Sequence, residues 1–199
     1  YYKGGWYRYV DGSFSLIPEK DVRMEVSGWL INSGAADVSV SLLNDIIVNM
    51  QSNALCGLPQ GKYTMPCFIS TGESAFEFVS TKNGIINVDE IVNAMEKGLP
   101  PPAIRPHNPD LFTTVSVPYA YDPVATCPKF KAYLEGVQPK PENREILQML
   151  AGLLLTSDMR YNVAFFLVGE SGTGKTIFMD ILECLVGKEN CCCVPLASS

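Results

Sequence analysis

One eight-residue segment, Gly169–Thr176, constrains the fold of this chain more than any other. It reads Gly-Glu-Ser-Gly-Thr-Gly-Lys-Thr and satisfies the pattern G-x-x-x-x-G-K-[ST] at every position. The unbroken hydrophobic run Asn162–Val168 before it predicts a strand buried on both faces of a parallel sheet. The segment Lys175–Val186 after it predicts an amphipathic helix. Its inward side chains are expected to be Ile177, Phe178, Ile181, Leu182 and Leu185, with Asp180 and Glu183 outward.

A strand, a glycine-rich turn and a helix in this order predict a phosphate-binding loop. Glycines let the backbone approach phosphates with its amides pointing inward, and the helix N-terminus adds further amides and a favourable dipole. The predicted nucleotide-binding residues are Gly169, Glu170, Ser171, Gly172, Thr173, Gly174, Lys175 and Thr176. Lys175, the predicted catalytic residue, supplies charge to the β- and γ-phosphates, and the Thr176 hydroxyl is the predicted Mg²⁺ ligand. The predicted cofactors are therefore ATP and Mg²⁺.

The position of this loop in the chain also informs the fold class. Small nucleotide kinases usually place the loop near their N-terminus, whereas 168 residues precede it here. A strongly apolar helix is predicted at Glu142–Leu155, and a helix leading into the loop strand is typical of AAA+-like and helicase cores. Its predicted buried side chains are Ile146, Leu147, Leu150, Leu153 and Leu154. We expect an α/β protein that contains the first strand, loop and helix of such a domain.

The first 130 residues predict a mixed α+β domain. Expected hairpins are Trp6–Val10 with Ser13–Ile17 around Asp11-Gly12, and Phe76–Ser80 with Ile85–Val88 around Asn83-Gly84. Expected helices are Glu19–Asn32, with Val22, Val26, Trp29 and Leu30 on one face, Ser39–Asn53, and a short one near Glu90–Met95; Phe112–Val117 is a further candidate strand. Proline-rich Leu99–Pro109 and loop-like Pro118–Pro128 follow. The domain boundary is expected in Pro118–Pro128 or Gln138–Pro141, which divides the chain into 1–130 and 131–199.

Composition narrows the classes of partner and compartment. The net charge of −6 argues against a surface that clamps nucleic acid everywhere, although a local DNA-binding element stays open. No apolar run reaches the roughly 18 residues that a membrane span needs, so no membrane partner is expected. Seven cysteines without framework spacing favour a reducing, cytoplasmic location. The Cys191–Cys193 run is expected to begin a buried strand. Because the chain starts at Tyr1 inside apparently structured sequence, we expect a piece of a longer protein.

Two further clusters have a functional and a structural interpretation. Aromatic and basic side chains of the first hairpin could stack on and neutralise single-stranded DNA, but cross-strand packing is the favoured interpretation. These residues are Tyr1, Tyr2, Lys3, Trp6, Tyr7, Arg8 and Tyr9. Basic residues near the boundary could face DNA or another subunit, but a solvated surface is favoured. They are Lys129, Lys131, Lys140 and Arg144.

Several stretches in one order resemble the phage and plasmid primase–helicase family. They are Trp6-Tyr7-Arg8-Tyr9 with Asp11-Gly12, Lys82–Val88, His107–Thr114, Pro118–Pro123 with Ala125, Cys127-Pro128 and Phe130, then Leu147–Leu155 and the glycine-rich loop. Each motif alone is weak, but their order before the loop is quite specific. Members of this family join a poxvirus-helicase-like N-terminal domain to a superfamily 3 helicase domain.

The resemblance implies a replicative, ATP-dependent DNA helicase of a virus, phage or plasmid. It implies a homo-hexameric ring that travels on single-stranded DNA, in many cases with a primase domain upstream. Only the loop residues 169–176 match the family's nucleotide contacts here. The family's Walker B acid, sensor asparagine, arginine finger and DNA-binding hairpin all follow that loop, whereas this sequence ends 23 residues after Thr176. We therefore expect the 199-residue chain alone to show negligible ATPase activity.

Two alternatives stay open from the sequence. A different P-loop enzyme, such as a small-molecule kinase, would carry a lid with arginines and a base downstream of the loop. A non-catalytic docking module would bind nucleotide for structural reasons only. A helicase instead requires paired acidic residues after a second hydrophobic strand, and Asp180, Glu183 and Glu189 do not end such a strand.

Overall fold

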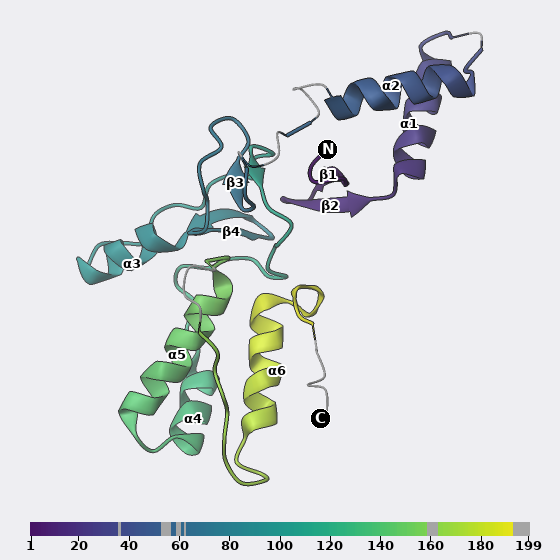
Figure 1. Cartoon of the computed structure of the whole chain (residues 1–199). Coiled ribbons are helices and arrows are strands. Elements are labelled where there is room, and N and C mark those ends of the chain that lie inside the picture. The colour runs from purple at the N-terminus through teal and green to yellow at the C-terminus, as the bar shows by residue number, and fades with distance from the viewer. Residues whose placement is uncertain (36, 53–56, 59–60, 62, 159–162, 193–199) are drawn as a thin grey trace. The chain divides into compact units, whose positions relative to one another are not determined.

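The computed structural model describes the chain except for residues 36, 53–56, 59–60, 62, 159–162 and 193–199. The described part is mixed α/β, with six α-helices and three two-stranded antiparallel sheets (Figure 1). It forms two compact units: Tyr1–Ala75 with Asn108–Thr114, and Phe76–His107 with Val115–Ser199. The mixed architecture expected from the sequence is confirmed. The predicted division between residues 130 and 131 falls inside a helix, and the division itself stays a prediction.

The first unit starts with the predicted hairpin of β1 (Trp6–Val10) and β2 (Ser13–Ile17). Val10 pairs with Ser13 across the two-residue turn, in which Asp11 has φ +48° and Gly12 φ +90°. Both positive angles are those of the expected type I′ turn.

Aromatic rings fill the core beneath this hairpin. The ring of Phe112 makes edge-on contacts with Tyr2, Tyr7 and Phe14 at centroid distances of 5.2, 5.5 and 5.0 Å. The Tyr2 hydroxyl donates a 2.9 Å hydrogen bond to the Tyr63 carbonyl. Phe112 belongs to β6 (Leu111–Phe112), which pairs with β3 (Cys67–Phe68). The strand expected at Phe112–Val117 is therefore wrong as one continuous strand: β6 ends at Phe112, and within the described residues Ser116 makes only an isolated bridge with Ser80.

Helices α1 (Glu19–Asn32) and α2 (Val40–Ser52) complete the first unit close to their predicted bounds, with Asn53 outside the described residues. Val22 of α1 and Ile47 of α2 are buried with Trp6, and Val26 packs against this cluster. Trp29 was expected on the inward face of α1 but is 67% exposed. The small cluster around Trp6 covers only the beginning of α1, so Trp29 and Ile31 at its end stay accessible.

The second unit opens with the hairpin of β4 (Phe78–Thr81) and β5 (Gly84–Asn87). Thr81 pairs with Gly84, so the turn consists of Lys82 and Asn83 rather than the expected Asn83-Gly84. Helix α3 (Val88–Glu96) follows directly, and the Asn87 side chain caps it by accepting a 2.9 Å hydrogen bond from the Glu90 amide. Helix α3 is longer than the predicted 90–95 segment. It begins directly after Asn87, which is both the last residue of β5 and the N-cap of the helix.

Three helices build the larger core of the second unit: α4 (Pro128–Val137), α5 (Pro141–Leu155) and α6 (Lys175–Val186) (Figure 1). A short 3₁₀ turn, η1, follows at Lys188–Asn190. Five buried side chains from the three helices contact one another: Leu134, Leu150, Ala151, Phe178 and Leu182. The helices at 142–155 and 175–186 match their predictions closely, whereas α4 was not predicted.

The apolar faces of α5 and α6 are only partly covered. Leu147 and Leu185 pack against the core, as predicted. The predicted burial is wrong for Ile146, Leu154 and Ile177, whose side chains are 51%, 44% and 55% exposed. Each helix meets its neighbours along one narrow stripe, and the flanking apolar positions lie beyond it.

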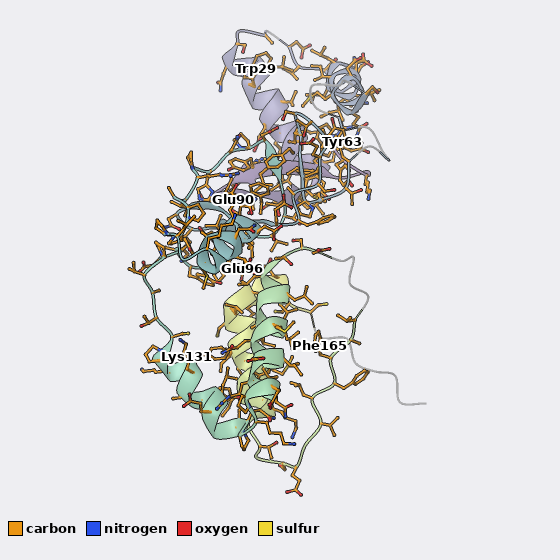
Figure 2. All side chains as sticks on the ribbon, turned by 90° about the vertical axis from the view of Figure 1, so that its left-hand side faces the viewer. Trp29, Tyr63, Glu90, Glu96, Lys131 and Phe165 are labelled. Atoms are coloured by element: carbon orange, nitrogen blue, oxygen red, sulfur yellow. The ribbon has the colours of Figure 1, made fainter. Side chains whose placement is uncertain are left out.

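The segment before the glycine-rich loop forms no strand over residues 163–168, and Asn162 lies outside the described residues. The expected buried strand is therefore wrong for the described part: Phe166 is 83% exposed and Val168 93%. Phe165 lies on this segment, which runs beside α5 (Figures 1 and 2). A strand needs a neighbouring strand for its hydrogen bonds, and no described segment pairs with residues 163–168. The AAA+-like fold of this region stays a prediction.

Candidate functional site

The glycine-rich loop reaches α6 through two residues with left-handed backbone angles, Gly172 at φ +81° and Gly174 at φ +86°. Gly174 is the N-cap residue and α6 begins at Lys175. Positive φ at Gly174 is strained for any residue with a side chain, and an added Cβ would lie 2.9 Å from Val137 Cγ1. At Gly172 an added Cβ would meet no atom within 4 Å, so the loop backbone there is open to an approaching group.

The Lys175 side chain folds back over the loop. Its ammonium group donates to the carbonyl oxygens of Gly169 and Glu170, at 2.8 and 2.6 Å, and to the Thr173 hydroxyl at 3.2 Å. The same hydroxyl donates a 2.8 Å hydrogen bond to the Glu170 carbonyl. Three donors of one cation thus meet three oxygens of the loop, which places a positive charge at the centre of Gly169–Thr173.

The other predicted contacts line the outside of the same turn. Glu170, Ser171, Gly172 and Thr173 are exposed, as is Thr176 in the first turn of α6. The first four amides of a helix have no partner within it, and they carry the positive end of its dipole. The structure therefore brings together one ammonium group, an exposed helix N-terminus and an exposed hydroxyl. This combination is suited to binding an anion with an associated cation.

Helix α4 contributes residues to this site that the sequence did not point out. The Tyr133 hydroxyl donates a 2.8 Å hydrogen bond to the Gly174 carbonyl, and the Tyr133 and Val137 side chains both lie against Gly174. The usable signal was the apolar spacing of Phe130, Tyr133, Leu134 and Val137, which marks one face of a helix. Without that helix, nothing in the sequence places residue 133 beside residue 174.

A cavity of about 400 Å³ adjoins the loop. Gly169, Thr173, Gly174 and Lys175 form its polar end. Apolar side chains of α4, α5, α6 and the 165–168 segment line the rest, together with the amides of Gln138 and Asn143. Asn143 Nδ2 donates a 3.1 Å hydrogen bond to Gln138 Oε1 across the turn between α4 and α5.

The acidic side chains near the loop do not gather into a cation site. Asp180 is exposed on α6, Glu183 is partly exposed one turn later, and Glu189 is exposed in η1. Within the ranges that the structure describes, no group of three or more His, Cys, Asp or Glu side chains is arranged to hold a metal ion. Thr176 thus stays the predicted Mg²⁺ ligand of this chain.

Three other clusters named in the sequence analysis lie in different environments: the residues of the first hairpin, the basic residues near the boundary and the cysteine run. Tyr2 and Trp6 are buried, Tyr7 packs in the aromatic core, and Arg8 pairs with Glu25, which confirms the packing interpretation. Lys129, Lys131 and Lys140 are exposed and Arg144 is half-buried, which fits both a solvated surface and a surface that faces DNA or another subunit (Lys131 in Figure 2). Cys191 and Cys192 are exposed and form no strand, so that expectation is wrong for them, and Cys193 lies outside the described residues.

Part of the chain matches a known family model. Residues 62–139 match the family model described as "D5 N terminal like", a domain of primase–helicase proteins. The match covers less than half of the chain, runs from β3 through α4, and includes the stretches at 82–88, 107–114 and 118–130 on which the resemblance was based. It ends before the glycine-rich loop. Among the curated proteins compared, none matches this chain.

The matched domain is associated with primase–helicase proteins, which supports a role in DNA replication. No helix in the described part of the chain is long and apolar enough to cross a membrane.

Proposed function

We propose that this chain carries the ATP-binding loop of a replicative DNA helicase of the primase–helicase type. The observation that carries the proposal is the Lys175 ammonium held inside Gly169–Thr173 at the start of α6. The "D5 N terminal like" match just upstream supports the helicase class over other P-loop proteins.

The residues of the loop fit a nucleoside triphosphate bound with Mg²⁺. Lys175 Nζ lies over the loop on the Gly169 and Glu170 carbonyls, and β- and γ-phosphates bound there would replace these hydrogen bonds with stronger charge-assisted ones. The open backbone at Gly172 lets amides approach the phosphate oxygens. Thr176 is exposed in the first helical turn, where its hydroxyl would hold Mg²⁺.

Hydrolysis needs more than these groups. A carboxylate must orient the attacking water, and a neighbouring arginine commonly stabilises the charge that develops. Asp180 and Glu189 are exposed on α6 and η1, away from any strand end, and are poor candidates for this role. We propose that the acid and the arginine come from other parts of a homo-hexamer that acts on single-stranded DNA inside the cell.

Two other functions use the same loop. A small-molecule kinase would transfer the γ-phosphate to an acceptor, and a docking module would bind nucleotide without turnover. The family match favours neither, whereas it is expected for a helicase.

Measurement of phosphate release separates the three functions. The full-length gene product is assayed with Mg·ATP, with and without single-stranded DNA, beside the same protein carrying Lys175→Ala. We expect phosphate release that rises with DNA, fork unwinding, and loss of both in the variant. Phosphate transfer to a small acceptor without stimulation by DNA would favour the kinase, and binding without any turnover would favour the docking module.

A further inference from the structure

Tyr133 of α4 makes a hydrogen bond to the glycine-rich loop that is 41 residues away in sequence. Its hydroxyl donates to the Gly174 carbonyl at 2.8 Å. The same carbonyl accepts the Phe178 amide at 3.0 Å, the first hydrogen bond of α6. Both acceptor positions of the Gly174 carbonyl are therefore used, one by the helix itself and one by α4.

A carbonyl held at two points fixes the whole peptide group. The peptide bond between Gly174 and Lys175 is planar and trans, so the Lys175 amide points opposite to the Gly174 carbonyl. That carbonyl points along α6 toward Phe178, and the Lys175 amide therefore points out of the helix N-terminus. It is one of the first helical amides that have no partner within the helix. The Tyr133 hydroxyl thus sets the direction of an amide that faces the proposed phosphate position.

Close packing adds to this hydrogen bond. A Cβ at Gly174 would lie 2.9 Å from Val137 Cγ1 and 3.3 Å from the Tyr133 hydroxyl, so the last turns of α4 lie directly on the Gly174 backbone. Leu134, on the same face of α4, is buried against Leu150 and Phe178. One face of helix α4 therefore packs into the helical core and also holds the loop.

The chemistry of Tyr133 suits a permanent donor. A tyrosine hydroxyl ordinarily keeps its proton at neutral pH, and burial raises the pKa of the Tyr133 hydroxyl further. A phenylalanine at this position would keep the ring and lose only the donor.

We infer that Tyr133 is a positioning residue for the phosphate-binding loop, acting through the Gly174 carbonyl to aim the Lys175 amide. Because Tyr133 lies inside the family match at 62–139 and Gly174 outside it, this contact joins the matched region to the nucleotide loop. The expected effect of Tyr133 on nucleotide affinity rests on the proposed function. Its expected effect on the loop backbone does not.

The test compares Tyr133→Phe with Tyr9→Phe in the 199-residue chain. Tyr9 is a suitable control because its hydroxyl is buried in the first unit without a hydrogen-bond partner in the described structure. Amide hydrogen exchange is measured first, without nucleotide. We expect the Phe178 amide to exchange about three- to tenfold faster in Tyr133→Phe than in the wild type, with the melting temperature lowered by no more than about 5 °C. Tyr9→Phe should leave that rate unchanged. Equal exchange rates in all three proteins would overturn the inference whatever the chain binds.

Affinity is measured second, with Mg·ATP and with magnesium tripolyphosphate as probes. Tyr133→Phe should weaken both by the same factor of about three to ten, because the altered amide faces phosphate and not the nucleoside. Weakening of Mg·ATP alone would contradict the inference by placing Tyr133 at the nucleoside. If Phe178 exchanges faster in Tyr133→Phe but the wild type binds neither probe, the positioning role of Tyr133 is supported. The proposed nucleotide-binding function is then contradicted.

Discussion

The backbone of Gly84 lies against the carbonyl oxygen of Arg105. Ile85 and Arg105 exchange backbone hydrogen bonds of 2.8 and 2.9 Å beside this contact, which joins the β4–β5 hairpin to the proline-rich segment before β6. A Cβ at Gly84 would overlap the Arg105 oxygen and come within 2.9 Å of Ile104 Cγ1. Gly84 also has φ +148°, an angle that side-chain-bearing residues rarely adopt.

Gly84→Ala is therefore expected to destabilise the second unit by about 2–4 kcal/mol, because both the backbone angle and the Arg105 contact must change. Urea unfolding followed by circular dichroism measures this cost. Gly152→Ala is the matched control: Gly152 is helical and exposed, and an added Cβ there meets no atom within 4 Å. That control should stabilise α5 by about 0.5–1 kcal/mol. Equal effects of the two substitutions would contradict the close approach of Arg105.

The turn beside Gly84 illustrates what sequence can predict. Asp11-Gly12 and Asn83-Gly84 look alike in the sequence, and the first forms the expected turn between paired neighbours. Asn83-Gly84 does not form the turn, because Gly84 pairs with Thr81 inside the hairpin. A glycine is required at this position because a side chain would not fit there. The reason is a contact with a residue 21 positions away, which local pattern cannot contain.

The sequence predicts the residues of the candidate site that are consecutive in the chain. It does not predict the residues of α4 that reach the site by tertiary packing. Residues 169–176 and the start of α6 follow from spacing alone, because their geometry is set by consecutive residues. Tyr133 and Val137 belong to the site through the packing of α4 on Gly174. The run 163–168 has the composition of a buried strand, yet a strand also requires a pairing partner, and composition does not supply one.

The helical core gives a second prediction. Leu134 is 1% exposed at the centre of α4, α5 and α6, and Leu134→Ala should cost about 2–5 kcal/mol. Ile146→Ala, on the half-exposed face of α5, should cost less than about 1 kcal/mol. Thermal unfolding of both variants measures the difference. A larger cost at Ile146 would show that the apolar stripe of α5 is covered after all.

Cys67 gives a prediction about reactivity. Its side chain is fully buried, and burial, with a smaller contribution from the Asp110 carboxylate, raises the pKa of the thiol despite a hydrogen bond with the Thr64 backbone. Alkylation with iodoacetamide at pH 8, mapped by mass spectrometry, should modify exposed Cys127 and Cys184 well before Cys67. Early modification of Cys67 would contradict its burial.

The same thiol predicts a loss of stability in alkaline solution. Its pKa is higher in the folded chain than the ordinary value of 9.0, so the folded state holds the proton more tightly than the unfolded state. The stabilisation is complete below about pH 9 and is lost as pH rises from there through the folded value. The free energy of unfolding of the wild type, measured from pH 7 to pH 11, should fall above pH 9. The free energy of unfolding of Cys67→Ala should fall less steeply over that range.

Binding of Mg·ATP by Lys175→Ala tests the central claim most directly. Isothermal titration calorimetry is performed on the wild type, on Lys175→Ala and on Lys188→Ala, in which an exposed lysine of η1 is removed as a control for net charge. The account predicts that Lys188→Ala binds like the wild type and that Lys175→Ala binds at least tenfold more weakly, because a charge-assisted contact to phosphate is lost. Equal affinity of the wild type and Lys175→Ala would contradict the assignment of Gly169–Thr176 as the nucleotide site.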